Sequence, residues 1–390
     1  MSARTDSQSL RITHLRLRNW RNFKNVDIDL SQRCFVFGPN ASGKSNFLDA
    51  FRFLRDLAVD PGGLQYAVRS RGGMGRVRSL ASRNNNKGGI TVGVAIGTDL
   101  VPKKWEYELT FSAEKSGLKR PVVIEEVVKK EGCAVLLRRG AEEGDDEALT
   151  QSRIEQVTQN KEFREIAEFF GTISYLHLVP QVIRDPRRSA ENADDPYGGD
   201  FIAHIARTPK RDRERRLRVI NASLQLAVPQ LADLQQTQDI DGQPHLQARY
   251  KHWRSASAYQ NEKDFSDGTL RLIGFLWSLQ EKSGVALLEE PELSLHEEVV
   301  RQLPAMISRA TRTSRQVIST THSWAILEDE GLGLNEVIVL STSGEGTTAC
   351  PVSELSVVVS LVNSGVSLRD SLHADLIPKT IRQLQFVDLG

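Results

Sequence analysis

The stretch FGPNASGKSN at residues 37–46 has the spacing G-x-x-x-x-G-K-S, which is suited to gripping the phosphates of a nucleotide. Glycines without Cβ atoms let backbone N–H groups close around phosphate oxygens, a lysine reaches the β- and γ-phosphates, and a serine hydroxyl binds Mg²⁺. The predicted phosphate-binding residues are Gly38, Pro39, Asn40, Ala41, Ser42, Gly43, Lys44, Ser45 and Asn46.

The flanking residues predict the elements that position this loop. Residues 34–37 are an apolar run typical of a buried strand, and residues 47–57 carry apolar side chains at helical spacing. The helix that begins near Lys44 then points its positive end at the phosphates. An ordinary glycine-rich turn is the alternative, but it does not require the full spacing together with both flanking elements.

Adjacent carboxylates end a second apolar strand, GVALLEEPELSLH at residues 284–296. Open parallel sheets bind ligands at the carboxyl ends of their strands, so Glu289 and Glu290 are expected to face the loop. One carboxylate can hold Mg²⁺ through water, while its neighbour positions and deprotonates the attacking water. A solvated glutamate pair is the alternative, and the combination with the loop favours catalysis.

Two more stretches carry polar groups at the ends of predicted elements. QVISTTHSW at residues 316–324 is an apolar strand that leads to His322. FSDGTLRLIGFLWSL at residues 265–279 places Ser266, Gly268 and Arg271 at the start of an apolar helix, where Ser266 is the predicted N-cap. Taken singly, these features indicate a core histidine and a routine cap. Their order along the chain gives them a second interpretation.

That order resembles the ABC-type ATPase heads of the RecF, SMC and OLD group: a P-loop, a long insertion, a serine-glycine signature, an acidic strand end and a histidine. LRLRNWRNFKNVDIDL at residues 15–30 resembles the opening strand and Asn-Phe turn of these heads. EEPELSLHE at 289–297 and STTHS at 319–323 resemble their later motifs. The resemblance covers roughly residues 10 to 345, and four motifs in order make it specific.

The resemblance implies a role for each residue. Glu289 and Ser45 would bind Mg²⁺, Glu290 would be the general base, and His322 would sense the γ-phosphate. Gln181 in LHLVPQVIRDP would be the Q-loop glutamine, a further metal ligand. Two features depart from the common ABC pattern: Glu289 stands where aspartate is usual, which puts the Mg²⁺ geometry in question, and SDGT replaces the transporter signature.

The resemblance also implies an assembly. In such heads the signature of one protomer meets the γ-phosphate held by the P-loop of the other. Ser266, Gly268 and Arg271 would therefore bind the nucleotide of a second copy, in a head-to-tail homodimer with ATP and Mg²⁺ at two shared sites. The implied activity is ATP hydrolysis.

The predicted fold class is α/β, an ABC-type P-loop head with a mixed or parallel core sheet, an antiparallel β lobe and a helical insertion. Strand-like runs at 90–96, 104–112, 121–130 and 133–139 predict the antiparallel lobe, and those at 285–288, 316–319 and 337–340 predict parallel strands beside the loop strand. The expected parts of this discontinuous head are a P-loop lobe (1–141), a helical insertion (142–264), a signature and switch-histidine lobe (265–345) and a C-terminal tail (346–390).

Composition limits the class of partner. Lys and Arg number 51 against 50 Asp and Glu, so a nucleic acid would need a local basic patch. Two such patches are predicted, Arg69 to Lys87 and Arg207 to Arg218, with DNA or an acidic protein as the ligand. Cys34, Cys133 and Cys350 are predicted to be reduced core residues. No apolar signal core and no apolar run near 18 residues occur, so we expect a cytoplasmic chain.

Three functions are open at this point. The favoured one is an ATP-driven sensor and control subunit of a bacterial defence or toxin-like system, with a separate nuclease-like effector. Residues 142–265 lack sustained heptads, and the acids after His322 lack a metal-binding arrangement, so neither a long coiled-coil arm nor a nuclease domain is predicted. The alternative is a RecF-like DNA-repair clamp. A P-loop small-molecule kinase is least favoured, because a kinase needs neither the signature nor the histidine.

Overall fold

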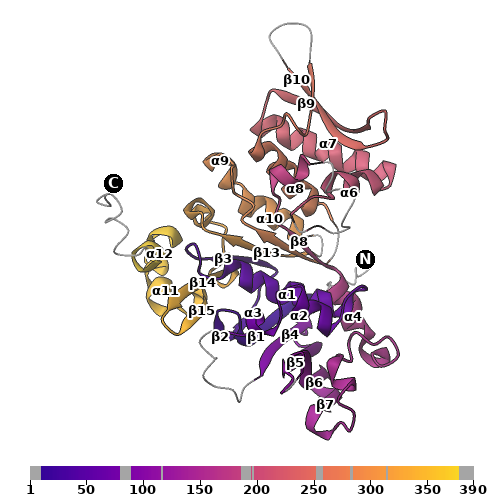
Figure 1. The fold of residues 1–390 in the computed structure, drawn as a ribbon. Coiled ribbons are helices and arrows are strands. Elements are labelled where there is room, and N and C mark those ends of the chain that lie inside the picture. The colour runs from indigo at the N-terminus through magenta and orange to yellow at the C-terminus, as the bar shows by residue number, and fades with distance from the viewer. Residues whose placement is uncertain are drawn as a thin grey trace, which may run out of the picture.

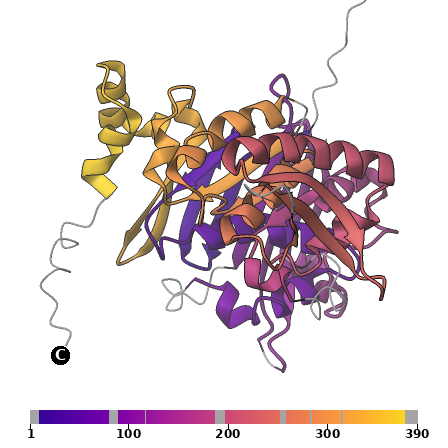
Figure 2. The same cartoon turned by 90° about the horizontal axis from the view of Figure 1, so that it is seen from above.

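The structure, a computed structural model, describes residues 10–79, 89–115, 117–185, 195, 197–251, 258–281, 284–312 and 315–376. Within these residues the strands form a 12-stranded mixed sheet and a separate three-stranded sheet. Helices cover both faces of one half of the large sheet and one face of its other half (Figures 1 and 2). The predicted α/β class with a mixed core sheet is therefore confirmed.

The parallel half of the large sheet carries the loop strand at its centre. Its strands run in the order β14 (Val337–Ser343), β3 (Arg33–Phe37), β13 (Arg315–Thr321), β12 (Gly284–Glu289) and β8 (Ile173–Leu176). Every residue of β3 and β13 is buried, and β3 carries the apolar run at 34–37 that predicted it. The predicted strands at 285–288, 316–319 and 337–340 are confirmed. Their parallel direction brings the ends of β3, β12 and β13 to one edge.

The antiparallel half extends the same sheet. Its strands are β1 (Arg11–Trp20), β2 (Phe23–Asp29), β4 (Ile90–Gly97), β5 (Trp105–Ala113), β6 (Pro121–Lys130) and β7 (Cys133–Arg139). Alternate residues of β5 are buried, as expected for a strand with one solvated face. The antiparallel lobe was predicted at the positions of β4 to β7. Cys34 is buried as expected, but Cys133 is exposed because it begins the edge strand β7.

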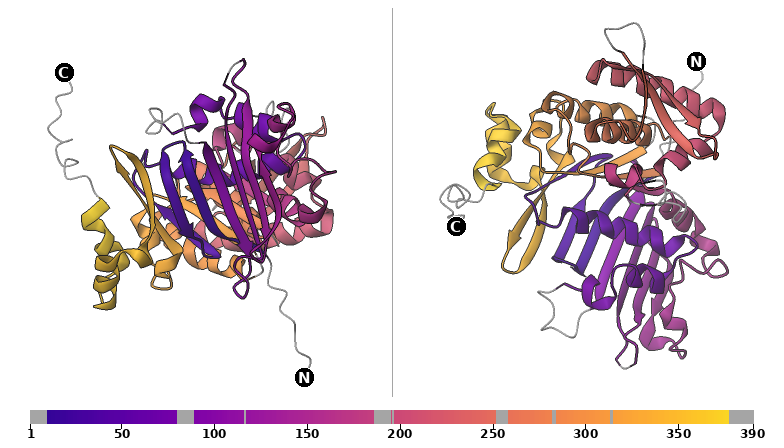
Figure 3. Two further views of the ribbon diagram at one scale, coloured as in Figure 1. Left: turned by 90° about the horizontal axis from the view of Figure 1, so that it is seen from below. Right: turned by 45° about the horizontal axis from the view of Figure 1, so that its top comes forward.

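A strand from the predicted C-terminal tail joins the two halves. β15 (Gly346–Pro351) pairs antiparallel with β14 and meets β2 at Thr347 and Phe23. The helices α11 (Ser356–Asn363) and α12 (Leu368–Leu376) follow it and lie at one side of the molecule (Figure 3). Residues 346–376 are thus an ordered part of the head.

Two buried clusters hold the helices to the sheet. One face packs against α1 (Lys44–Ala58), α2 (Leu64–Arg69), α3 (Met74–Val77) and α4 (Arg164–Gly171). The other packs against α8 (Asp267–Leu279), α9 (Glu297–Val300) and α10 (Leu303–Thr311). The apolar residues of 47–57 that predicted α1, namely Phe47, Leu48, Phe51, Leu54 and Leu57, are all 0% exposed. Burial of this stripe fixes the helix that follows the phosphate loop.

The predicted helical insertion is only partly helical. It contains α5 (Pro180–Ile183), α6 (Phe201–Arg207) and α7 (Lys210–Ala227), but also a small sheet of β9 (Leu231–Gln238), β10 (Pro244–Tyr250) and β11 (Ala258–Asn261). This small sheet was not predicted from the sequence, because strands such as LADLQQTQ are polar and poor in β-branched residues. Packing against α7 stabilises it instead. Figure 1 shows it at the end of the molecule opposite β5–β7. None of the described helices is long and apolar enough to cross a membrane.

Candidate nucleotide-binding and hydrolysis site

The loop between β3 and α1 has the backbone of a phosphate cradle. Gly43 precedes α1 with φ 97°, and a Cβ there would lie 1.9 Å from the Asn22 Nδ2 atom, so only glycine fits. The Lys44 Nζ atom donates to the Gly38 carbonyl oxygen at 2.9 Å and to that of Pro39 at 3.1 Å. The ammonium therefore lies inside the loop that the sequence assigned to phosphate.

Two side chains outside the motif brace this loop. The Asn22 Nδ2 atom donates to the Ser42 carbonyl oxygen at 3.1 Å and to the Thr347 hydroxyl at 2.7 Å. The Thr347 hydroxyl donates in turn to the Ser42 carbonyl oxygen at 3.0 Å, and Asn46 donates to Asn22 Oδ1 at 2.8 Å. Asn22 belongs to the Asn-Phe turn of the opening motif, but no role was predicted for it. Nothing in the local sequence pointed to Thr347.

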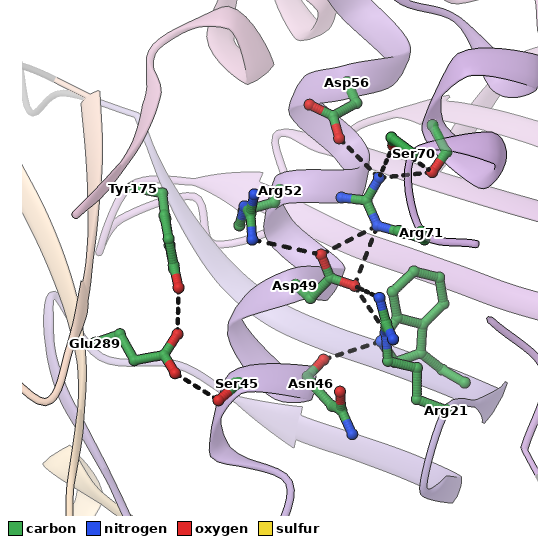
Figure 4. Close-up of polar contacts among 12 residues, drawn as sticks. Arg21, Ser45, Asn46, Asp49, Arg52, Asp56, Ser70, Arg71, Tyr175 and Glu289 are labelled. Carbon is green, nitrogen blue, oxygen red and sulfur yellow. Dashed lines mark hydrogen bonds and ion pairs between the residues drawn. The ribbon is translucent and has the colours of Figure 1, made fainter. Parts of the chain in front are cut away.

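The end of β12 brings both predicted carboxylates to the loop. The Ser45 hydroxyl donates to Glu289 Oε1 at 2.5 Å, and the Tyr175 hydroxyl donates to Glu289 Oε2 (Figure 4). Glu290 has φ 44° and places Oε1 3.2 Å from Lys44 Nζ. Its positive φ turns the chain at the strand end, so that both neighbouring carboxylates reach the loop.

The predicted switch histidine lies between two carboxylates. His322 Nδ1 is 3.4 Å from Glu290 Oε1 and 3.7 Å from Glu292 Oε1. Glu292 is buried and accepts from the Thr321 hydroxyl at 2.6 Å and from the His322 backbone N–H at 3.2 Å. Glu292 was not predicted as a site residue. Its position in EEPE, two residues after Glu290, was the available signal.

The charges of this cluster shift its acid–base behaviour. The hydrogen bond from His322, together with the positive charge of Lys44, lowers the pKa of Glu290 to about 2. The same hydrogen bond to Glu290 raises the pKa of His322. Burial raises the pKa of Glu292. A carboxylate held by two cationic groups accepts a proton poorly, so Glu290 needs both partners drawn away before it can act as a base.

The oxygen donors fit a magnesium ion. Mg²⁺ prefers oxygen ligands and is commonly held by one or two protein groups together with substrate phosphates and waters. Ser45 and Glu289 supply hydroxyl and carboxylate oxygens at the phosphate loop. Among the described residues, no group of three or more His, Cys, Asp and Glu side chains could hold a metal by itself. Phosphate oxygens and water would have to complete the shell.

The signature residues make their described contacts within α8 and with residues 181–184, and not with the phosphate loop. Ser266 caps α8 as predicted, with its hydroxyl accepting from the Thr269 N–H at 3.2 Å. Gln181 donates to Asp267 Oδ2 at 3.3 Å, and Arg184 binds Asp267 Oδ1 at 2.7 Å. The described contact of Gln181 is thus with the signature and not with Ser45 or Glu289.

Gly268 and Arg271 lie near the segment that follows β12. A Cβ on Gly268 would lie 2.4 Å from the Ser294 carbonyl oxygen, so the missing side chain permits this close packing. Burial lowers the pKa of Arg271, while Asp267, Glu290 and Glu292 oppose that effect. The start of α8 is therefore held against the same segment that carries Glu292.

The two predicted basic patches contain both interior and exposed bases. In the first, Arg71 is buried and bound to Asp49 at 3.1 Å and to Asp56 at 2.7 Å, and Arg83 and Lys87 lie outside the described residues. On the second patch, both acidic residues, Asp212 and Glu214, form ion pairs with bases of α7. The described pairs are Asp212 with Arg215 at 3.4 Å and Glu214 with Lys210 at 3.9 Å. The exposed bases of the second patch are Arg207, Lys210, Arg211, Arg215 and Arg218.

Fold and site together define an ABC-type P-loop ATPase head of the RecF, SMC and OLD group. Residues 34–328 match the family described as "AAA domain, putative AbiEii toxin, Type IV TA system", and residues 12–54 match the "P-loop containing region of AAA domain". The first match covers most of the chain, so the chain belongs to that AAA family. The group proposed from sequence is confirmed.

Two relatives share shorter segments. Endonuclease GajA of Bacillus cereus is 43% identical over 50 residues, which are 13% of this chain and 9% of that protein. The DNA replication and repair protein RecF of Nitrosococcus oceani is 34% identical over 89 residues, which are 23% of this chain and 24% of that protein. The matches thus span about a tenth of the first protein's length and about a quarter of the second's.

Two solved structures share the fold. An SMC head bound to the C-winged helix domain of ScpA matches with TM-score 0.51 and 14% identity, over 87% of this chain and 96% of that one. An SMC head with an extended coiled coil, derived from Pyrococcus furiosus and bound to the C-terminal domain of ScpA, matches with TM-score 0.52 and 11% identity, over 91% of this chain and 100% of that one. At these identities the likeness concerns the fold.

Proposed function

We propose that this chain binds and hydrolyses ATP and uses the nucleotide to control its own dimerisation. The observation that carries the proposal is the meeting of Lys44, Ser45, Glu289, Glu290 and His322 at one sheet edge. Motifs separated by more than two hundred residues reach hydrogen-bonding distance there, as a triphosphate site requires.

Each residue has a defined part in the proposed reaction. Lys44 leaves the Gly38 and Pro39 carbonyl oxygens to bind the β- and γ-phosphates. Ser45 and Glu289 would hold Mg²⁺, which when bound would neutralise charge on the phosphate oxygens. Glu290, once Lys44 and His322 turn to the phosphate, orients the attacking water and takes its proton. His322 donates to the γ-phosphate.

The proposed working unit is a head-to-tail homodimer. Ser266 and the start of α8 make their described contacts with Thr269, Gln181 and Arg184, so they do not complete the site of their own chain. A second copy would place its signature over the ATP held by this P-loop. Gly268 and Arg271 would then face the γ-phosphate of the other protomer.

At the level of the cell, we propose a cytoplasmic sensor and control subunit that acts on a separate nuclease-like effector. The family match to a toxin-system AAA domain and the shared segment with Endonuclease GajA support this reading. A RecF-like DNA clamp is the second candidate, supported by the segment shared with RecF and by the exposed bases of α7. Repair or replication genes beside this gene would favour the clamp, and a nuclease-like neighbour would favour the control subunit.

Sedimentation and phosphate release test the biochemical core of the proposal. With ATP and Mg²⁺, the Glu290→Gln protein should sediment as a dimer, because it binds ATP without releasing it by hydrolysis. The same protein with EDTA should sediment as a smaller species, and the wild type should release phosphate. Full hydrolysis by a strictly monomeric wild type would contradict the proposal.

A further inference from the structure

Tyr175 lies on β8, the strand next to the one that carries Glu289. In the parallel register of these strands, Tyr175 pairs with Leu287. Side chains two apart on a strand share a face, so Leu287 and Glu289 point to the side on which Tyr175 lies. The Tyr175 ring leans along β12, and its hydroxyl donates to Glu289 Oε2 (Figure 4).

The two oxygens of Glu289 are divided between two partners. Oε1 accepts from Ser45 at 2.5 Å, and Oε2 accepts from Tyr175. A glutamate has one more rotatable bond than the aspartate that is usual at this position, and fixing it costs conformational entropy. A donor on Oε2 offsets that cost and leaves Oε1 directed at the loop.

The tyrosine is itself held by the helix that follows the phosphate loop. The Arg52 guanidinium carbon lies 4.2 Å from the centroid of the Tyr175 ring, a cation–π contact. Arg52 also lies 3.9 Å from Asp49 Oδ1, one turn earlier on α1. Since α1 begins at Lys44, one helix supports both the phosphate loop and the ring that orients Glu289.

We propose that Tyr175 is a positioning residue that fixes the Glu289 carboxylate for Mg²⁺ and so adapts a glutamate to the place of the usual aspartate. The inference rests on the proposed role of Glu289 in binding the cation. It predicts that removing the hydroxyl weakens the contribution of the metal to nucleotide affinity and leaves metal-free binding unchanged.

The test measures ADP affinity by calorimetry, once with EDTA and once with Mg²⁺, in wild type, Tyr175→Phe and Tyr66→Phe. Tyr66 lines the same cavity of about 1370 Å³ as Tyr175 and makes no described contact with Glu289, so it is the matched control. The gain in affinity caused by Mg²⁺ should fall about tenfold in Tyr175→Phe, the loss typical when the partner of a metal ligand is removed. It should be unchanged in Tyr66→Phe.

Two outcomes overturn the inference. An unchanged Mg²⁺ gain in Tyr175→Phe would show that the hydroxyl is dispensable, and an equal loss of ADP affinity with and without Mg²⁺ would reduce Tyr175 to a structural residue. Glu289→Gln separates this from the proposed function: if it keeps the Mg²⁺ gain, the role of Glu289 itself is wrong. In a Glu289→Asp background, Tyr175→Phe should have no further effect, because the shorter carboxylate no longer reaches both partners.

Discussion

The phosphate-loop side of the site and the signature side are built in different ways. On the first, Lys44 is 6% exposed and bound to two carbonyl oxygens and to Glu290, and Ser45 is bound to Glu289. On the second, Ser266 and Asp267 are bound to neighbours in their own helix and in α5. The residues of the phosphate-loop side contact one another within one chain. On the signature side, the start of α8 is held in place, but no described residue of the phosphate loop contacts it.

This difference indicates which steps of the proposed reaction a single chain can carry out by itself. In the proposed mechanism, phosphate and cation bind to groups that already touch one another. Hydrolysis would then depend on freeing Glu290 from Lys44 and His322, and closure would depend on the signature of a second chain. Variants of Lys44, Ser45 and Glu289 should therefore weaken the binding of nucleotide or cation, whereas a variant of Glu290 should leave binding and slow hydrolysis. Variants on the second side should leave binding and remove closure.

The largest effect is expected from Lys44→Ala. The change removes the positive charge that binds the β- and γ-phosphates, so all nucleotide-dependent function should be lost. Loss of ATP binding, measured by equilibrium dialysis, checks this. Lys24→Ala is the control, since Lys24 forms an exposed ion pair with Glu345 at 3.1 Å and makes no described contact with the phosphate loop. Normal ATP binding by Lys44→Ala would break the first half of the comparison.

Glu290→Gln should slow hydrolysis on the order of a hundredfold or more and leave ATP binding intact, because the amide cannot take a proton from the water. Steady-state phosphate release together with ATP affinity separates the two effects. The exposed variant Glu354→Gln serves as the control. A normal rate in Glu290→Gln would mean that another group is the general base. His322→Ala should show a milder loss of the same kind.

The sequence predicted the parts of the site that are local in the chain. Each of these parts is a characteristic residue type at the end of a periodic element: the loop, the two glutamates, His322 and the Ser266 cap. Partners that meet through the fold were missed: Thr347 lies 305 residues from Ser42, and Tyr175 lies 114 residues from Glu289. Those contacts depend on strand order, which no short pattern encodes.

Surface chemistry was predicted less well than the sheet. Strands with continuous or alternating apolar residues were located, because burial decides both their sequence and their position. The basic stretches contain no such signal. Arg71 proved to be an interior partner of Asp49 and Asp56, and Arg216 stacks on Trp277 with 5.0 Å between its guanidinium carbon and the ring centroid. The charge of an arginine in the sequence did not show whether its side chain is exposed to solvent or buried in the interior.

The exposed bases of α7 are the proposed binding site for a polyanion. If DNA binds there through about four phosphates, log affinity should fall with log salt at a slope of roughly −3.6, without strong base preference. Reversing Arg211, Arg215 and Arg218 to glutamate should weaken binding by about tenfold or more for all sequences alike. Fluorescence anisotropy with duplexes of two sequences measures this. Binding that ignores both salt and the reversals would leave α7 to an acidic protein partner.

Mixing two inactive variants tests whether the two sides come from different chains. Dimers of Lys44→Ala alone, or of Ser266→Ala alone, have no intact composite site. A mixed dimer has one, so equal amounts of the two proteins should recover about a quarter of wild-type hydrolysis if subunits exchange at random. A labelled subunit verifies that the subunits have exchanged. If hydrolysis does not recover after that exchange, the model of a shared site is contradicted.

The smallest expected effect is a pH dependence of stability at the junction of the two sides. The pKa of His322 is raised in the folded chain, so the stabilisation from its contact with Glu290 is fully present below the unfolded pKa of about 6.5 and is lost as pH rises through the folded pKa. Glu290, with a pKa of about 2, stays ionised across this range. The free energy of unfolding of the nucleotide-free protein should therefore exceed that of His322→Asn most clearly near pH 5 to 6, by less than about 1 kcal/mol because the imidazole is partly solvated.

His373→Asn is the control, since His373 contacts Trp324 and has no carboxylate partner among its described contacts. Urea unfolding at several pH values measures the difference, and a difference that grows above pH 8 would place the stabilising partner of His322 elsewhere.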